Sequence, residues 1–111
     1  MKREETICRD ILSRTEMIRA FTADGREAFL QSPLTQEAVI RCFEVIGEAI
    51  KRIDPSLLTA YPEVPWSDFT GFRNFLIHQY DKIELPLVWD VIEYDLPPLQ
   101  DAVQRILDGL L

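Results

Sequence analysis

Apolar residues recur along the chain at the spacing of helices. Between residues 34 and 53 they follow one another at intervals of three and four: Val39, Cys42, Phe43, Ile46, Ala49, Ile50 and Ile53. This spacing places them on one stripe of a helix. Comparable stripes occupy residues 3–21 and 66–80, and no alternating apolar and polar segment of strand length occurs. The pattern therefore predicts an all-α fold.

Glycine, proline and capping residues predict where the first helices end and begin. Ala23-Asp24-Gly25 ends the first helix, and a short helical piece at residues 26–30 follows it. Ser32 is then placed to cap the next helix, with Pro33 at its first position, where a missing N–H costs nothing. The connection between the first two long helices is therefore short.

Prolines also divide the second half of the chain. Asp54-Pro55 ends the helix of residues 34–53, and the loop that follows is expected to hold one turn at residues 56–61. Pro65 and Pro86 begin further helices, and Asp95 is predicted to cap a new helix that carries Leu99, Val103, Ile106, Leu107 and Leu110. Four longer helices with short connections predict an up-and-down bundle that forms a single domain over residues 1–111. Pairing of this bundle with a second copy would bury further surface.

The charge balance limits the classes of partner. The chain of 111 residues carries a net charge of -7, which argues against a broad nucleic-acid-binding surface, so any RNA contact must be local. No apolar run is long enough to cross a bilayer, and the N-terminus has no apolar core of a secretory signal. We therefore expect a cytoplasmic protein without a membrane partner.

The cysteines and the single histidine bound the metal chemistry. Cys8 and Cys42 lie far apart among apolar neighbours, which is typical of core thiols rather than of a disulfide or metal pair. With one histidine, a zinc site would have to recruit isolated carboxylates. We expect no metal or other cofactor, although a carboxylate-bound Mg²⁺ stays open.

The stretch GFRNFLIHQY, residues 71–80, contains the only histidine, His78. Asn74 lies one helical step before His78, on the face opposite to the one predicted to be core, which carries Phe69, Phe72, Phe75 and Leu76. Arg73 is rotated about 140° from His78. A second copy of the helix in a twofold dimer would make it easier to bring both side chains onto one phosphate.

These residue types suit RNA cleavage without a metal. An imidazole titrates near neutral pH, so His78 is suited to take a ribose 2′-hydroxyl proton or to protonate a leaving 5′-oxygen. Arg73 is suited to hold phosphate oxygens and to stabilise the charge that develops on them. An Arg and a His at a helix end also commonly satisfy the helix dipole and nearby carbonyls, so spacing alone leaves both interpretations open.

A family resemblance adds to this reading. Arg73, Asn74, three residues, His78, one residue and Tyr80 follow the R-x4-6-H-x-Y motif of HEPN domains. The phrases RDIL (9–12), AVIRCFEVIGEAIKRI (38–53), YPEVPW (61–66) and VWDVIEYDLPPL (88–99) resemble the HepT-like branch of that superfamily. The resemblance covers nearly the whole chain in order.

The resemblance implies an all-α homodimer with its two motifs close to the dimer interface, acting as a toxin and a metal-independent ribonuclease. It also implies a partner, a minimal nucleotidyltransferase antitoxin of the MntA type that transfers AMP onto the motif tyrosine. By position, Arg73 and His78 would be catalytic, Asn74 would orient the substrate, and Tyr80 would accept AMP. Such a modification would block RNA by bulk and like charge.

Rival interpretations remain. The chain would otherwise be a weakly catalytic nucleotide-binding or adaptor subunit that binds the same partner, or a helical dimer in which the motif only stabilises the interface. Glu44 and Glu48 would support the Arg/His cluster or form a solvated face, on which Glu48 and Arg52 are spaced as an ion pair. Gly47 is expected to mark close helix packing, Gly71 to do likewise or admit a dimer partner, and Trp66 and Trp89 to be packing anchors.

Overall fold

A computed structural model describes residues 2–111 and is built of helices. The α-helices are α1 (Lys2–Phe21), α2 (Arg26–Gln31), α3 (Pro33–Arg52), α4 (Pro55–Leu58), α5 (Trp66–His78), α6 (Leu85–Asp90) and α7 (Leu96–Leu110). A 3₁₀ turn, η1 (Tyr80–Lys82), follows α5, and a π-helical turn, η2 (Val91–Asp95), joins α6 to α7. These residues contain no strand, so the all-α prediction is confirmed.

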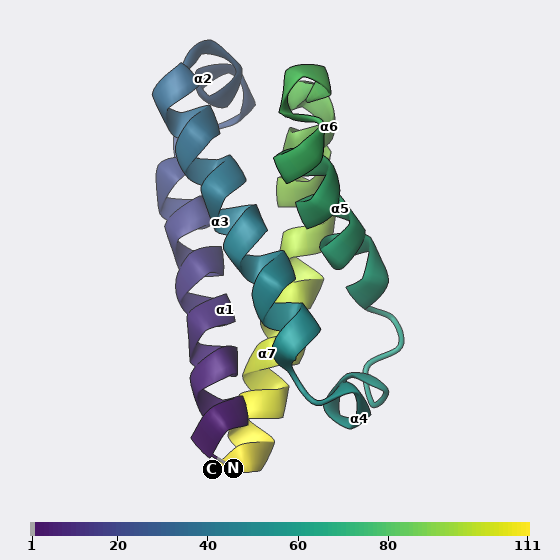
Figure 1. Cartoon of the computed structure of the whole chain (residues 1–111). Coiled ribbons are helices and arrows are strands. Elements are labelled where there is room, and N and C mark those ends of the chain that lie inside the picture. The colour runs from purple at the N-terminus through teal and green to yellow at the C-terminus, as the bar shows by residue number, and fades with distance from the viewer. Residues whose placement is uncertain (1) are drawn as a thin grey trace.

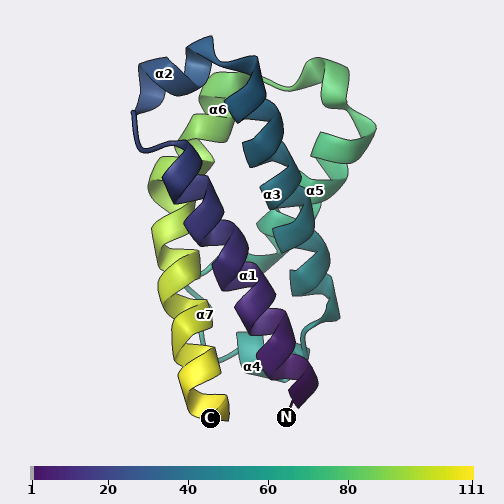
Figure 2. The ribbon, with the colours of Figure 1, turned by 90° about the vertical axis from the view of Figure 1, so that its left-hand side faces the viewer.

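The long helices form the predicted up-and-down bundle. Figure 1 shows α1 running up, α3 down, α5 up and the α6–η2–α7 rod down. Seen from the side, α1 lies between α7 and α3, and both ends of the chain reach the same end of the bundle (Figure 2). The principal contacts join α1 with α3, α3 with α5, and α1 with α7. No helix in the described range 2–111 is long and apolar enough to span a membrane.

One apolar core runs through the bundle. Its largest fully buried side chains are Phe29, Phe43, Ile7, Ile11, Ile18, Ile46, Leu76, Leu96 and Leu99. Cys8 and Cys42 lie in this core as free thiols, as predicted. Burial, followed by the nearby charge of Glu4, raises the pKa of the Cys8 thiol to about 11. Both cysteines are therefore packing residues here.

The predicted beginning of α3 is confirmed. The Ser32 hydroxyl accepts a hydrogen bond from the Thr35 backbone N–H at 3.2 Å, and Pro33 occupies the first turn. Asp54 caps the short α4 in the same way, accepting from the Ser56 N–H at 3.0 Å. Both caps satisfy donors that a helix start leaves free.

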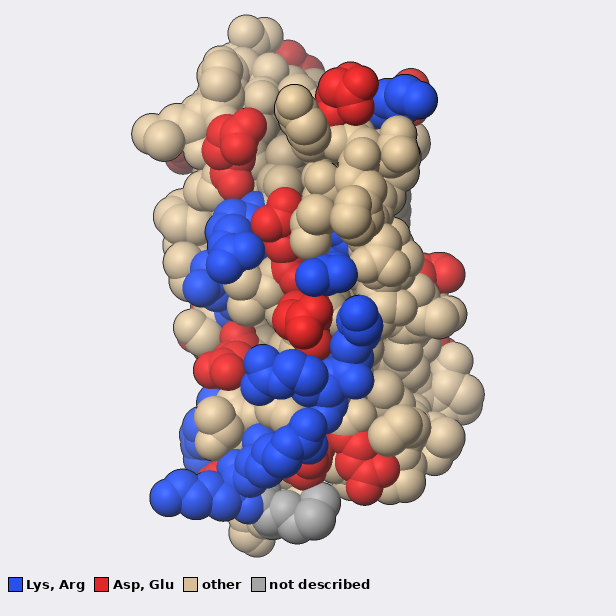
Figure 3. All heavy atoms as spheres, in the orientation of Figure 1, with Lys and Arg blue, Asp and Glu red and all other residues tan. Residues whose placement is uncertain are grey.

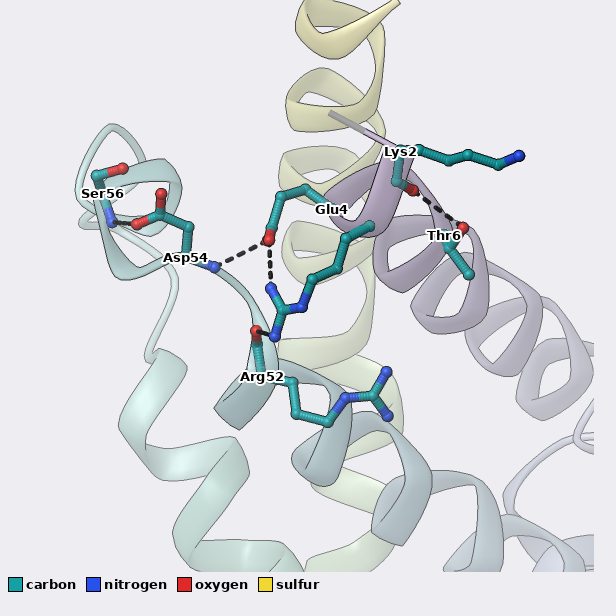
Figure 4. A network of polar contacts seen from close by, with 7 residues as sticks. Lys2, Glu4, Thr6, Arg52, Asp54 and Ser56 are labelled. Atoms are coloured by element: carbon teal, nitrogen blue, oxygen red, sulfur yellow. Dashed lines mark hydrogen bonds and ion pairs between the residues drawn. The ribbon is translucent and has the colours of Figure 1, made fainter.

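Polar contacts tie the beginning of α1 to the end of α3 (Figure 4). The buried Glu4 carboxylate accepts from the Asp54 backbone N–H at 2.9 Å and pairs with Arg3. Arg3 also donates to the Arg52 carbonyl at 2.6 Å, which satisfies one of the carbonyls that a helix end leaves free. Hydrogen bonds that Ser56 donates to the Asp54 carboxylate, together with the nearby Arg3 charge, lower the pKa of this carboxyl below its usual value.

The predicted helix after Asp95 is present as α7, but Asp95 does not cap it as expected. Asp95 is itself helical and makes no side-chain cap hydrogen bond. The chain continues from α6 into α7 through η2, where the Leu96 N–H donates to the Val91 carbonyl five residues back. Pro97 and Pro98 lack a backbone N–H, and the wider turn carries the helix into them without a break.

One prediction about α5 also needs correction. Phe75 was expected in the core but is 41% exposed. It lies about 120° around the helix from Phe69, at the edge of the stripe that Phe69 and Leu76 bury against α3. The helix ends at His78, and Tyr80 falls in the exit turn, as the sequence indicated.

Candidate active site

Arg73 lies where α5 packs closely against Gly47 of α3. A Cβ atom built on Gly47 would lie 2.3 Å from the Arg73 Cβ and 2.9 Å from the Phe69 carbonyl oxygen. Ordinary carbon contacts need about 3.5–4.0 Å, so only glycine fits. The predicted role of Gly47 is confirmed. Gly71 has no comparable neighbour in residues 2–111, so it does not mark helix packing within the chain.

Two side chains hold the guanidinium of Arg73. Its Nη2 lies 3.2 Å from the Glu48 carboxylate on α3, and its Nη1 donates to the Asn74 amide oxygen at 2.9 Å. The Nε atom is buried and has no hydrogen-bond partner in the described residues. The sequence paired Glu48 with Arg52, whereas the structure pairs it with Arg73, because α5 brings this guanidinium into reach.

The Arg73 side chain lines a cleft between α3 and α5, which we call the α3–α5 cleft. Its polar lining is contributed by Asp10, Arg41, Glu44, Glu48, Arg52 and Arg73. The Arg73 side chain is 23% exposed, so it is braced on one side and open to a ligand on the other. A guanidinium held in this way is suited to phosphate oxygens.

His78 and Tyr80 lie beyond this cleft. His78 is exposed in the last turn of α5, and no hydrogen bond joins it to Arg73 or Asn74 within the described chain. Tyr80 is 75% exposed and lines a neighbouring concavity with Ile40 and Glu44. A single copy thus pairs Arg73 with Asn74 and Glu48, and it leaves His78 and Tyr80 as solvent-facing groups nearby.

An apolar groove runs along the other side of α5, between α5 and α6. It is lined by Phe72, Phe75, Lys82, Ile83, Glu84, Leu87, Val88 and Val91. Phe75 and Leu87, at 41% and 56% exposure, are large apolar side chains that water reaches. The sequence did not indicate this groove, because the apolar residues of α5 all resembled core residues.

The two tryptophans are packing anchors, as predicted. Trp66 donates from its indole N–H to the Tyr61 carbonyl at 3.0 Å and thereby closes the loop before α5. Trp89 packs its ring 5.7 Å from that of Phe29 and donates to Glu93 at 3.1 Å. Neither ring is therefore a free platform for stacking bases.

Comparison with known proteins gives the family. Residues 11–106 match the model of the family described as "Ribonuclease HepT-like". This chain belongs to the HepT-like family. The match includes Arg73, Asn74, His78 and Tyr80, so the whole motif lies within the HepT-like region.

Three curated relatives match this HepT-like chain over most of both chains. It is 38% identical over 102 residues to "Putative RNase MJ0125" of Methanocaldococcus jannaschii, covering 91% of this chain and 88% of that protein. It is 40% identical to "Putative RNase MJ0127" of the same organism, covering 91% and 84%. It is 36% identical over 98 residues to "Probable ribonuclease HepT" of Thermococcus cleftensis, covering 87% and 89%. No solved structure is a significant match.

Proposed function

We propose that this protein is a metal-independent endoribonuclease in which Arg73 and His78 act on the same phosphodiester. The observation that carries the proposal is the bracing of Arg73. Gly47 lets its side chain pass, Glu48 and Asn74 fix its guanidinium, and a cleft opens beside it. The family and the ribonuclease names of its relatives support the same reaction class.

The chemistry follows from the two residue types. His78 takes the proton of a ribose 2′-hydroxyl, and this oxygen attacks the adjacent phosphorus. The bond to the 5′-oxygen breaks, and that oxygen leaves with a proton supplied by an imidazolium or by water. Arg73 stabilises the charge on the phosphate oxygens, and Asn74 orients the Arg73 guanidinium. The products are a 2′,3′-cyclic phosphate and a 5′-hydroxyl, so only RNA is cleaved.

A homodimer completes this site in the proposal. Within one copy Arg73 and His78 point from different sides of α5, and a twofold partner supplies the second set of both residues. Ile77, which lines the α3–α5 cleft beside Arg73, is a large apolar side chain that is 36% exposed, and it supports contact with a second copy on this side of α5.

Regulation by AMP transfer fits the position of Tyr80. We assign the chain as the toxin of a HepT/MntA-type pair in the cytoplasm, silenced when its nucleotidyltransferase antitoxin places AMP on the Tyr80 hydroxyl. The 75% exposure of Tyr80 supports an acceptor that an enzyme can reach. The added phosphate and nucleoside would repel and obstruct RNA beside the motif.

Expression of variants tests the ribonuclease proposal. We expect growth arrest with the natural chain and relief with Arg73→Ala and with His78→Ala, while circular dichroism shows that both remain helical. Arg105→Ala is the matched control, because Arg105 is an exposed residue of α7 away from the cleft. Arrest that persists in both motif variants would favour an adaptor that binds a nucleotidyltransferase, or a motif that is structural only.

A second variant tests the role of Tyr80. We expect Tyr80→Phe to keep cutting RNA and to escape silencing by the antitoxin and ATP, because the ring stays and only the acceptor oxygen is lost. Intact mass after incubation with both should show one or more added AMP groups on the natural chain and none on Tyr80→Phe. Loss of cutting by Tyr80→Phe would give the hydroxyl a direct catalytic role and contradict this assignment.

A further inference from the structure

Basic and acidic side chains lie together on the face that bears the α3–α5 cleft. The net charge of the chain is -7, so long-range attraction does not bring RNA to it, and binding must come from local contacts. Figure 3 shows Lys and Arg side chains from the centre of this face toward its lower left, with Asp and Glu between them. Within the cleft, three arginines and three carboxylates balance one another.

Two of these arginines lie on α3, on either side of the place where Arg73 of α5 contacts that helix. Arg41 and Arg52 lie on α3 and line the same cleft as Arg73. Measured from Glu48, which pairs with Arg73, Arg41 lies seven residues before and Arg52 four residues after, or about 10 Å and 6 Å along the helix axis. Along the axis of α3, the contact that Arg73 makes with Glu48 therefore lies between the positions of Arg41 and Arg52.

Both flanking arginines are available for a ligand. Arg52 has no ion pair in residues 2–111, and only its carbonyl is engaged, by Arg3. Arg41 pairs with Glu44 at 3.4 Å, and its side chain is 68% exposed. Exposed pairs of this kind contribute about 0–1 kcal/mol, so a phosphate competes readily for Arg41.

We propose that Arg41 and Arg52 are phosphate-binding residues for the RNA strand on either side of the bond that Arg73 holds. This inference rests on the proposed ribonuclease function and adds the path of the substrate. Arg41 lies at the end of the cleft that is nearer to His78. Ile77, the residue before His78, lines this cleft, and Glu44, which pairs with Arg41, also lines the concavity of Tyr80. The strand thus follows α3, with one flanking phosphate on Arg41 and the other on Arg52.

The path also explains how AMP on Tyr80 would silence the enzyme. Glu44 lines both the α3–α5 cleft and the concavity of Tyr80, so the two spaces adjoin. An adenylyl phosphate on Tyr80 would lie beside the Arg41 end of the strand. It would compete for that guanidinium and repel the flanking phosphate that Arg41 binds.

The salt dependence of RNA binding tests the inference. The probe is a single-stranded 2′-O-methyl RNA, which lacks the attacking hydroxyl, and its affinity for the unmodified chain is measured by fluorescence anisotropy over a series of KCl concentrations. Each phosphate contact on a single strand contributes about 0.7 to the slope of log affinity against log salt. We expect Arg41→Ala and Arg52→Ala each to lower the slope by about 0.7, and the double variant by about 1.4.

Two controls isolate the effect. Arg105→Ala removes the same charge from α7 and should leave the slope unchanged. Arg52→Lys keeps the charge but loses the bidentate fork, so it should retain the slope while weakening binding severalfold. Circular dichroism checks that each variant is folded.

The outcomes separate this inference from the proposed function. The phosphate path would be overturned if Arg41→Ala and Arg52→Ala had the same salt slopes as the natural chain or Arg105→Ala, or if the natural chain did not bind the probe. Either result would count whether or not ordinary RNA is cut. The expected slopes without any cutting of ordinary RNA would support the path and contradict the ribonuclease. Unchanged RNA binding with lost capture of a purified nucleotidyltransferase would mean that Arg41 and Arg52 serve the partner instead.

Discussion

Replacing Gly47 by alanine tests the close crossing of α3 and α5. The new Cβ would lie 2.3 Å from the Arg73 Cβ, whereas a carbon contact needs about 3.5–4.0 Å. The Phe69 carbonyl at 2.9 Å blocks a shift to that side, and it belongs to backbone that cannot rotate away. The two helices must therefore separate by about 1 Å or more, or Arg73 must leave its position.

The free energy of unfolding can be worked out from two opposing effects. Crowding of this kind costs about 1–3 kcal/mol in a packed interior. Alanine in place of glycine within a helix returns about 1 kcal/mol through backbone propensity. We expect Gly47→Ala to lose about 0–2 kcal/mol in net terms. Because Arg73 is displaced, RNA cleavage by Gly47→Ala should fall by more than the decrease in the folded fraction of the protein accounts for.

Gly71→Ala is the matched comparison. Gly71 lies within α5, and a Cβ there would meet no atom within 4 Å among residues 2–111. The same propensity gain of about 1 kcal/mol then applies without the crowding. Urea unfolding of both variants should place Gly47→Ala about 1–3 kcal/mol below Gly71→Ala, since the propensity gains cancel. Equal stability of the two variants, with cleavage unchanged in Gly47→Ala, would refute the reasoning.

Three further substitutions probe charged residues. Glu48→Gln should change the free energy of unfolding by less than about 1 kcal/mol, because the pair is partly exposed, yet lower RNA cleavage as Arg73 loses its brace; unchanged turnover would contradict that role. Glu4→Ala should cost about 1–3 kcal/mol in urea unfolding by stranding the Asp54 N–H, and no loss would show that the hydrogen bond is replaced by water. Burial, and then Asp68, raises the pKa of the Asp95 carboxyl, so its ionised form opposes folding. Asp95→Asn should therefore raise the melting temperature at pH 7, and this gain should vanish below about pH 4, where the carboxyl is neutral in both the folded and the unfolded chain.

Periodicity predicted the helices and most of the core, because burial sets the spacing of apolar residues. It could not separate Phe75 from Phe72, since both lie within the apolar side of α5 and only the neighbours decide which is covered. It also predicted a side-chain cap at Asp95 that the structure lacks, because the chain is already helical when it reaches this residue. The π turn that carries the helix through depends on hydrogen bonds that no residue type encodes.

Part of the candidate site could also be predicted from the sequence. Gly47 in the buried stripe of an amphipathic helix signalled a close crossing, and the motif identified Arg73 and Asn74, which the structure joins by a hydrogen bond. The link from Glu48 to Arg73 could be offered only as one of two interpretations. It spans two helices, and local spacing favoured Arg52 instead. The expected meeting of Arg73 with His78 across a dimer stays a prediction.

The chemical nature of cut RNA ends tests the central claim most directly. The unmodified chain, verified by intact mass, is incubated with a mixed cellular RNA pool in excess EDTA, and the new ends are mapped. The account predicts 2′,3′-cyclic phosphate and 5′-hydroxyl ends that disappear with His78→Ala. Ends of another kind, cutting that EDTA abolishes, or no cutting by the folded protein would contradict an Arg73 and His78 ribonuclease.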